Sequence, residues 1–371
     1  MRPRLAALLG ALVLSGCLGG AAPQGSPTAE PTATPRPTIR PTPVPPPPTP
    51  TLAPTSTPTP TAAPIAAING VLGEGAVTAR LPLAVMIDDN VAARPQSGFN
   101  AASLVYQAPA DGGEDRYMLV FQDVDALDIG PVRSGRPYFV YWAAEYRAGF
   151  GHYGGDEKTL QRVIPAASGT LIYNLDAMFG SGAAYHRIKT RKAPHNGYTS
   201  TAALWGVAAD KQYPTAMVAG LGTRPFKDDA TPADRPAGGS ITVPYNRGNS
   251  DYAYDPATNT YLRSIAGKAH VDPADGRRVA AKNVVVLTMR LSYDPESEAG
   301  HRRPILDQIG QGAALVFRDG TVVAGTWKKA DQGGLTRFYD AAGVEIALNR
   351  GRTFIQVVAT GTKITYDAAA E

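Results

Sequence analysis

Proline is concentrated in one stretch of this chain. Of the 33 prolines in the 371-residue sequence, 16 fall between Pro23 and Pro64, among many threonines and alanines. Such a composition cannot bury enough apolar surface to offset the entropy lost on ordering. We therefore interpret residues 17–64 as a Pro/Thr-rich tether and expect the folded part of the chain to span residues 65–371.

The residues before the tether have the pattern of a bacterial lipoprotein signal. Arg2 and Arg4 precede a short apolar run, residues 5–14, and Leu14-Ser15-Gly16-Cys17 matches the lipobox. The apolar run is too short to span a bilayer as a mature helix. We predict a signal peptide at residues 1–16 and lipidation of Cys17 with fatty acyl chains such as palmitate. The alternative is an ordinary signal peptide with a cysteine there by chance.

Lipidation would place the chain on the extracytoplasmic face of the cell membrane. Each buried methylene of an acyl chain contributes about 0.8 kcal/mol to membrane binding. Polyproline II segments rise about 3.1 Å per residue, so the tether would reach on the order of 100 Å. We interpret the tether as a spacer. Its many threonines also fit a glycosylated or wall-threading stalk.

Composition excludes several classes of protein. Cys17 is the only cysteine, which excludes an intramolecular disulfide framework and a Cys-rich zinc site. Only four of the 36 basic residues and one of the 32 acidic residues precede residue 65, so the folded part carries a net charge of about +1. A nearly neutral body lacks the basic surface that nucleic acid requires, and no nucleic-acid partner is expected.

Residues 65–225 have the pattern of an α/β domain. Apolar runs at 83–87, 103–106 and 117–121 predict strands, whereas apolar residues within 138–147 follow a helical period. Further helices are predicted from about 156 to Pro165 and from a cap at Thr199 or Ser200 to about Asp210. Strands followed by helices indicate an α/β, sandwich-like N-terminal domain.

The last third of the chain is predicted to be a smaller, mostly β domain. Residues 214–239 are polar and rich in Gly, Pro and Asp, which indicates a boundary or a long loop. Residues 240–371 contain a strongly β-branched run at 283–291 and hairpin signals at Asp275-Gly276 and Asp319-Gly320. The predicted fold class is therefore α+β or α/β, with the two types of structure largely separated along the chain.

Two basic clusters are candidates for binding anions. Arg133 and Arg136 precede the helix at 138–147, with Ser134 as a predicted N-cap, and helix N-termini and arginine forks both favour anions. The alternative is that these arginines pair with acids nearby in the sequence at 123–128. The second cluster, residues 185–196, contains Arg187, Arg191, His195 and Asn196, and is either a solvated loop or a second set of anion-facing groups.

Further polar residues are candidates for the lining of a cleft. Asp88 and Asn90 follow the apolar run 83–87, so they are expected at the carboxyl end of a buried strand. With His195 and Asn196, we add Arg94 and His152 to this predicted cleft. His152 and Asp156 match no standard metal-ligand spacing, and no metal site is predicted. No Gly-x-Ser-x-Gly or phosphate-binding Gly-x-x-x-x-Gly-Lys motif occurs, so serine hydrolases and P-loop proteins have no positive support.

Several blocks, taken together and in order, resemble a known family. They are 84–90, 93–98, 104–109, Gly112-Gly113, Ile129-Gly130-Pro131-Val132-Arg133-Ser134-Gly135-Arg136-Pro137, 193–200, Tyr254-Asp255-Pro256 and Gly325-Thr326-Trp327-Lys328. The chain resembles the YerB-like bacterial lipoproteins over residues 80–360. The resemblance implies a secreted, membrane-anchored protein with an N-terminal and a C-terminal domain, and no established reaction. Gln107 stands where the family pattern leads us to expect an acid.

A separate resemblance concerns layout alone. A strand, a Gly-Gly turn, a second strand and an arginine-containing turn follow each other in an order similar to that in the LytR-CpsA-Psr phosphotransferases. This likeness implies that Arg116, Arg133 and Arg136 face a pyrophosphate, and that Asp88 helps to hold Mg²⁺. The same order also arises by chance in α/β domains.

Two functions follow as hypotheses. The first is a membrane-anchored extracytoplasmic lipoprotein of the cell envelope that binds an anionic ligand, such as a lipid phosphate, a glycopolymer or a partner protein. Its candidate anion-binding residues are Arg116, Arg133, Arg136, Arg187 and Arg191, and it needs no cofactor. The alternative is an envelope phosphotransferase or glycopolymer-transfer enzyme, for which Mg²⁺ is a possible cofactor. The sequence assigns no catalytic residue.

Overall fold

Strand β1 (Leu83–Asp88) is buried along its whole length and lies inside the larger of two main sheets. The structure, a computed structural model, describes residues 64–371. The predicted signal peptide, Cys17 and the predicted tether up to residue 63 lie outside the described residues. Within the described part, no helix is long and apolar enough to cross a membrane.

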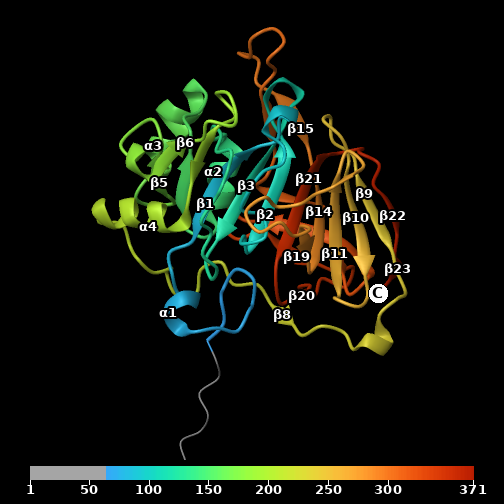
Figure 1. The fold of residues 1–371 in the computed structure, drawn as a ribbon. Helices are drawn as coiled ribbons and strands as arrows, with labels where there is room; N and C mark the ends of the chain where they lie inside the picture. Colours follow the sequence, from blue (N-terminus) through green and yellow to red (C-terminus); the bar gives the residue numbers. More distant parts are fainter. Residues whose placement is uncertain (1–63) are drawn as a thin grey trace, which may run out of the picture. The chain divides into compact units, whose positions relative to one another are not determined.

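The larger sheet has eleven strands (Figure 1). Its order is β19-β18-β17-β14-β21-β2-β3-β1-β4-β5, and β23 pairs with β18. Besides β1, the strands are β2 (Leu104–Pro109), β3 (Asp115–Phe121), β4 (Gly149–His152), β5 (Tyr173–Asp176), β14 (Asn283–Met289), β17 (Gly310–Arg318), β18 (Thr321–Lys329), β19 (Arg337–Tyr339), β21 (Thr353–Ala359) and β23 (Ala369–Ala370).

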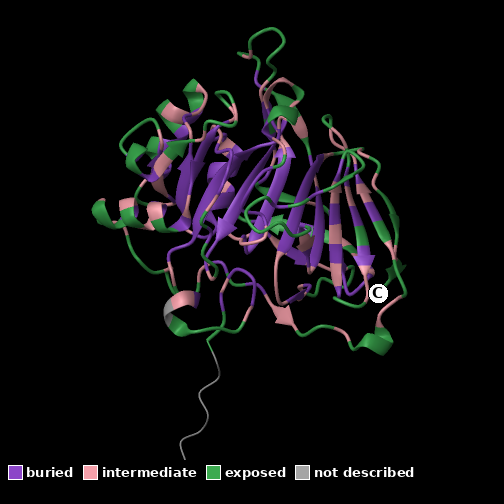
Figure 2. Ribbon diagram, in the orientation of Figure 1, coloured by how far each residue is buried: buried purple, intermediate pink, exposed green. Residues whose placement is uncertain are grey.

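Strand β21 joins the two sequence segments in this sheet. It lies between β2 and β14 and is parallel to both, with Phe354 opposite Val105 on one side and Val284 on the other. Figure 2 shows that the central strands are buried almost throughout. The boundary predicted near residue 225 therefore does not coincide with a break in the sheet.

The smaller sheet has six strands, in the order β12-β11-β10-β9-β22 with β13 beside β11. They are β9 (Ser240–Val243), β10 (Ser250–Asp255), β11 (Thr260–Ile265), β12 (Lys268–Ala269), β13 (Ala280–Ala281) and β22 (Thr365–Asp367). After Asp234, all regular elements in the described residues are strands. This agrees with the mostly β character predicted for residues 240–371.

Alternate residues of the larger sheet enter two hydrophobic cores. Met86 and Tyr106 lie in a core with Trp142 of α2 (Pro137–Ala144), and the Trp142 ring stacks on Tyr106 at 5.0 Å. Val85 and its neighbours on the opposite face pack in a second core with α4 (Thr201–Asp210) and the smaller sheet. The larger sheet is thus covered on both faces, which explains its continuous apolar strands.

Two helices lie where the sequence predicts them, and a third differs from its prediction. Helix α2 covers most of the predicted 138–147, and Ser200 caps α4 by accepting a hydrogen bond from the Ala203 N–H at 3.2 Å. The helix predicted to stop at Pro165 is instead a π-helix, η3 (Thr159–Val163), followed by α3 (Ile164–Ala167). Pro165 lies in the first turn of α3, where its missing N–H is not needed.

The remaining elements are short. They are α1 (Gly75–Thr78), η1 (Val91–Ala93), η2 (Asp111–Gly113), η4 (Gly182–Ala184), η5 (Pro232–Asp234), and the strand pairs β6 (Tyr185–Arg187) with β7 (Gly197–Thr199), β8 (Phe226–Lys227) with β20 (Leu348–Asn349), and β15 (Leu291–Tyr293) with β16 (Pro304–Leu306). The basic segment 185–196 is therefore part of a hairpin, and the predicted boundary segment contains β8 and η5.

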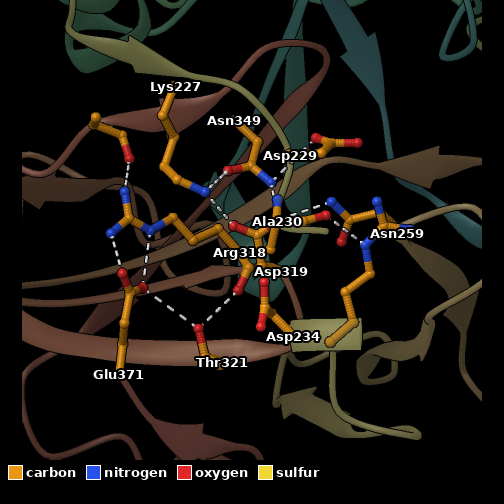
Figure 3. A network of polar contacts seen from close by, with 12 residues as sticks. Lys227, Asp229, Ala230, Asp234, Asn259, Arg318, Asp319, Thr321, Asn349 and Glu371 are labelled. Carbon is orange, nitrogen blue, oxygen red and sulfur yellow. Dashed lines mark hydrogen bonds and ion pairs between the residues drawn. The ribbon is translucent and has the colours of Figure 1, made fainter. Parts of the chain in front are cut away.

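Asp319 fixes that boundary segment to the β-rich region (Figure 3). It lies at the β17–β18 turn and accepts hydrogen bonds from Lys227 Nζ at 2.5 Å, the Ala230 N–H at 3.1 Å and Asn259 Nδ2 at 2.8 Å. Asn349 Nδ2 also donates to it. Burial opposes ionisation of Asp319, but these hydrogen bonds outweigh it and lower its pKa to about 2.

Candidate functional site: a cavity lined by arginines

A cavity of about 300 Å³ lies where β1 ends and β3 begins. Four arginines supply its positive lining, Arg116, Arg133, Arg136 and Arg247, and His301 lies beside them. The rest of the lining is Asp88, Asn90, Asp111, Gly112 and Glu114. We call it the arginine cavity. It unites five of the residues predicted from the sequence: Asp88, Asn90, Arg116, Arg133 and Arg136.

Strand register explains why these residues meet. Strands β1 and β3 are antiparallel with Asp88 opposite Arg116, so the end of one strand and the start of the other lie together. The β2–β3 connection, η2, turns back at the same edge and adds Gly112 to the lining. Gly112 has a φ of 64°, and a Cβ atom there would lie 3.3 Å from Nδ1 of His301, so glycine suits this position on both counts.

Arg116 is the cation of the cavity that has no acid partner. Its side chain is buried, and it forms no ion pair within residues 64–371. Its Nη1 donates a hydrogen bond to the Ser134 carbonyl oxygen at 3.1 Å, and its Nε has no hydrogen-bond partner. Burial, followed by repulsion from Arg136, lowers the pKa of Arg116 to about 10, so the guanidinium remains charged at neutral pH.

Arg136 is held by Asp111. Its Nε donates to both carboxylate oxygens of Asp111, at 2.8 and 2.9 Å, and its Nη2 donates to Oδ2. Asp156 lies 3.7 Å from the same Nε. Burial would raise the pKa of Asp111, but the hydrogen bonds from Arg136 outweigh it and lower that pKa. Arg136, rather than the predicted Ser134, occupies the N-cap position of α2.

Asp88 connects Arg133 with His195. Its Oδ2 lies 3.3 Å from Arg133 Nε and 2.7 Å from His195 Nδ1. The segment before α2 runs beside the end of β1, because the Asp88 N–H donates to the Pro131 carbonyl oxygen at 3.0 Å. His195 contacts Asp88, one of the three acids that line the cavity, without being itself among the lining residues. A carboxylate oxygen only accepts hydrogen bonds, so Nδ1 of His195 donates to Asp88. The neutral ring therefore has its proton on Nδ1.

The fourth arginine comes from the β-rich region. Arg247 pairs with Glu114, Nη2 to Oε1, at 2.7 Å, and Asn90 Nδ2 donates to the same Glu114 oxygen at 3.1 Å. Three of the four arginines thus each have an acid partner among the lining residues. The cavity therefore contains one guanidinium more than it has carboxylates, and that guanidinium is Arg116.

Arg94 and Asn196, predicted for the cleft, and Arg187 and Arg191, predicted to bind anions, lie outside the lining of the arginine cavity and bond within the protein. Arg94 pairs with Asp89 at 2.9 Å and lines a different cavity. In the β6–β7 hairpin, Arg187 Nη1 donates to Asn196 Oδ1 at 2.6 Å, and Arg191 Nη2 donates to the Pro95 carbonyl oxygen at 2.5 Å. The first contact lies within the hairpin, and the second fixes the hairpin against the segment that follows β1.

His152 is buried away from the arginine cavity. Its Nδ1 lies 2.8 Å from the Gly154 carbonyl oxygen, and its Nε2 lies 2.8 Å from Asn174 Oδ1. Both ring nitrogens are thus engaged within the protein, and the contact of Nε2 joins β4 to β5. Among residues 64–371, no three His, Cys, Asp or Glu side chains are grouped in a way that would hold a metal ion.

Gln107, the residue found where an acid was expected, bridges the two sheets. Its Nε2 donates to Asp89 Oδ2 at 3.2 Å, and its Oε1 accepts from Ser250 Oγ at 2.8 Å and Arg263 Nη2 at 2.9 Å. Arg263 is fully buried and belongs to the smaller sheet. The amide satisfies an acid and a cation at once, because it both donates and accepts.

The sequence did not identify half of the cavity lining. Asp111 and Gly112 carried a signal, since they form a turn between two predicted strands, but that signal indicated only a turn. Glu114, Arg247 and His301 are in no recognisable motif. Arg247 reaches Glu114 across 133 positions of sequence, so no local pattern identifies the pair.

The comparisons define the class of protein to which this fold and site belong. Two family models match: Protein of unknown function (DUF3048) N-terminal domain over residues 69–214, and DUF3048 C-terminal domain over residues 241–355. The chain therefore belongs to the DUF3048 family, and the family models divide it into an N-terminal and a C-terminal domain, as predicted.

A named relative is YerB of Bacillus subtilis. The chain is 31% identical over 301 residues to "Putative lipoprotein YerB" from strain 168, across 78% of this chain and 85% of the relative. The crystal structure of YerB protein from Bacillus subtilis has a TM-score of 0.70 at 26% identity, covering 82% of this chain and 99% of that one. The resemblance to YerB-like lipoproteins is thus confirmed.

Proposed function

We propose that this protein is a lipid-anchored lipoprotein on the extracytoplasmic face of the cell membrane, and that it binds an anionic ligand in the arginine cavity. Anchoring is supported by the lipobox ending at Cys17 and by the name of the relative. Ligand binding is supported by the buried guanidinium of Arg116, which forms no ion pair within residues 64–371.

Arg116 is a buried cation that lacks a carboxylate. An uncompensated buried charge is costly, because its interactions with water are lost and no opposite charge replaces them. Arg133, Arg136 and Arg247 have acid partners, so they do not need a ligand to be neutralised. An anion entering the cavity would supply the missing charge and hydrogen-bond acceptors to Arg116. This single imbalance is the main support for the proposal.

The chemistry of the cavity favours phosphate. Guanidinium groups pair bidentately with phosphate and carboxylate oxygens, and several of them converge here. The lining holds four arginines and three acids, so its small excess of positive charge suits a compact phosphate or pyrophosphate group better than an extended polyanion. In an envelope lipoprotein, such a group would come from a lipid phosphate, from a phosphate-containing glycopolymer or from a partner protein.

Arg116→Met tests the proposal, with inorganic pyrophosphate as the probe and titration calorimetry as the measurement. The native protein should bind the probe, and Arg116→Met should weaken binding at least tenfold without lowering the free energy of unfolding. Arg136→Met is the matched control, because it leaves Asp111 without its partner and should destabilise the fold. A native protein that binds no pyrophosphate, or an Arg116→Met variant that binds it equally well, contradicts the proposal.

An envelope phosphotransferase or glycopolymer-transfer enzyme is the second candidate. The observation in its favour is the contact between Asp88 and His195, since an acid that orients a histidine at a phosphate site is an arrangement used in general acid–base catalysis. Asp88 is already engaged by both His195 and Arg133, so it is poorly placed to hold Mg²⁺. If this candidate is right, His195→Gln should abolish transfer of a phosphoryl group while pyrophosphate still binds.

A further inference from the structure

A larger cavity opens beside the arginine cavity. It has a volume of about 710 Å³ and lies between the segment that follows β1 and the β11–β12 hairpin with the residues after it. Most of its lining is apolar and includes Val91, Pro95, Ala266, Ala269 and Val271. Val91 is 63% exposed and Val271 is 39% exposed, so apolar side chains on both sides face solvent. We call this cavity the apolar groove.

The two cavities are adjacent. Arg247 lines both of them, and the neighbouring residues Asn90 and Val91 line the arginine cavity and the apolar groove, respectively. Arg94 Nη1 donates to the Arg247 carbonyl oxygen at 3.2 Å, which holds the shared wall in place. The two cavities therefore meet at Arg247.

The charged residues that line the apolar groove are all basic, and two of them, Arg94 and Arg247, pair with acids outside the lining. Arg94, Arg247 and Lys268 are among its lining residues, which include no acid in the described chain. Lys268 forms no ion pair within residues 64–371, and its side chain is exposed. A cationic amphiphile is disfavoured by this arrangement, whereas an apolar chain attached to an anion is favoured.

His270, at the buried side of the groove, adds no charge. Burial, followed by repulsion from Arg263, holds the pKa of His270 well below its usual value. Its Nδ1 lies 2.8 Å from Arg263 Nη1, and because a guanidinium only donates, Nδ1 must accept. The neutral ring therefore presents an uncharged surface beneath the apolar side chains.

We propose that the apolar groove holds the hydrocarbon portion of an amphiphilic phosphate whose phosphate group occupies the arginine cavity. This inference rests on the proposed function and narrows its ligand to a phosphate ester with an apolar chain. Three observations support it: Arg247 lines both cavities, the charged residues that line the groove are all basic, and apolar side chains of the groove are exposed. Binding forms no covalent bond and requires no cofactor.

A homologous series of alkyl phosphates tests the inference. Residues 64–371 form one compact unit that contains both hydrophobic cores, so this segment is used without detergent. Ethyl, butyl, hexyl and octyl phosphate are titrated below their aggregation concentrations, with inorganic pyrophosphate as the chain-free arm. Since a buried methylene is worth about 0.8 kcal/mol, affinity should rise up to about fourfold with each added methylene until the groove is filled.

Substitutions in the groove test where the alkyl chain of the ligand binds. Ala269 is exposed in β12 and lines the groove, so Ala269→Trp should fill it and abolish the gain from chain length. Pyrophosphate binding should not change in this variant. Ala341→Trp, at an exposed residue that is not part of the groove lining, is the matched control and should retain the gain.

The outcomes separate this inference from the proposed function. If pyrophosphate binds and chain length has no effect, the inference is overturned and the anion site stands. If affinity still rises with alkyl chain length in the Ala269→Trp variant, the inference is also overturned, because the alkyl chain then binds elsewhere. If neither pyrophosphate nor any alkyl phosphate binds, both proposals fail. Binding of octylammonium as tightly as octyl phosphate would show that the groove does not select an anionic amphiphile.

Discussion

His195 Nδ1 lies 2.7 Å from Oδ2 of Asp88, although the two residues are 107 positions apart in the chain. The contact joins the end of β1 to the hairpin formed by β6 and β7. The same carboxylate oxygen lies 3.3 Å from Arg133 Nε. Asp88 therefore links the arginine cavity to a hairpin in which Arg187 and Arg191 are occupied by internal contacts.

Asp88→Asn should change both binding and stability. The carboxylate that neutralises Arg133 is removed, so pyrophosphate should bind several-fold more tightly as repulsion within the cavity falls. The loss of charge-assisted hydrogen bonds to His195 should lower the free energy of unfolding by about 1–3 kcal/mol. Titration calorimetry and urea denaturation measure the two effects. Weaker binding in this variant would show that Asp88 positions the arginines and does not merely compete with the ligand.

Asp111→Asn should destabilise the protein strongly. The substitution removes the acid that receives three hydrogen bonds from Arg136, and leaves that buried guanidinium with only the more distant Asp156, 3.7 Å from its Nε. Breaking a buried pair in this way costs about 3–5 kcal/mol. The double variant with Arg136→Met should lose less than the sum of the two single losses, because the second change removes the stranded cation. Additive losses, measured by urea denaturation, would contradict a direct pairing.

The stability that Asp319 contributes by anchoring the boundary segment should depend on pH. Its pKa is lowered to about 2 in the folded protein from an ordinary value of 3.8, so its contribution is fully present above pH 3.8. That contribution decreases as the pH falls and is lost as the pH passes through about 2. The difference in stability between the native protein and Asp319→Asn should therefore be constant from pH 5 to 7 and shrink towards pH 2. A difference that does not change with pH would contradict this role.

The sequence predicted the parts of the site that depend on local pattern. Asp88 follows an apolar strand, and Arg133 and Arg136 precede an apolar helix, so their places at element ends could be inferred from the residues alone. Which elements lie side by side is a non-local property. The apolar run of β21 indicates a buried strand but not that it lies between β2 and β14. For the same reason Arg247 and His301, which reach the cavity from the β-rich region, were not predicted.

Cys17→Ala should leave the protein without a lipid anchor. No other cysteine exists in the sequence to accept a diacylglycerol group. Metabolic labelling with a fatty-acid probe should mark the native protein and not the variant, and membrane fractionation should show the variant released from the membrane. A Ser15→Ala variant serves as a control, because it keeps the cysteine and a small residue before it. Equal labelling of native protein and Cys17→Ala would contradict the lipobox interpretation.

Residues 240–371 should not be soluble when produced alone. Strand β21 is buried between β2 and β14, so removing the N-terminal segment leaves its backbone groups unpaired along one edge and exposes Phe354 and its apolar neighbours. Such an exposed, apolar edge strand is a site of aggregation. Limited proteolysis of the intact protein should instead cut near residues 215–220, which are largely exposed, and spare the stretch that Asp319 holds at Lys227 and Ala230.

The two fragments of such a cut should stay together. Because the strands of both fragments form one sheet, a protein cut near residue 218 should elute at its native volume in size-exclusion chromatography and separate only in denaturant. Producing residues 65–218 and 219–371 together should also restore a soluble complex, whereas residues 240–371 alone should precipitate. A soluble, monodisperse 240–371 fragment with a cooperative unfolding transition would show that the β-rich region folds independently, and that its pairing with β2 contributes little to its stability.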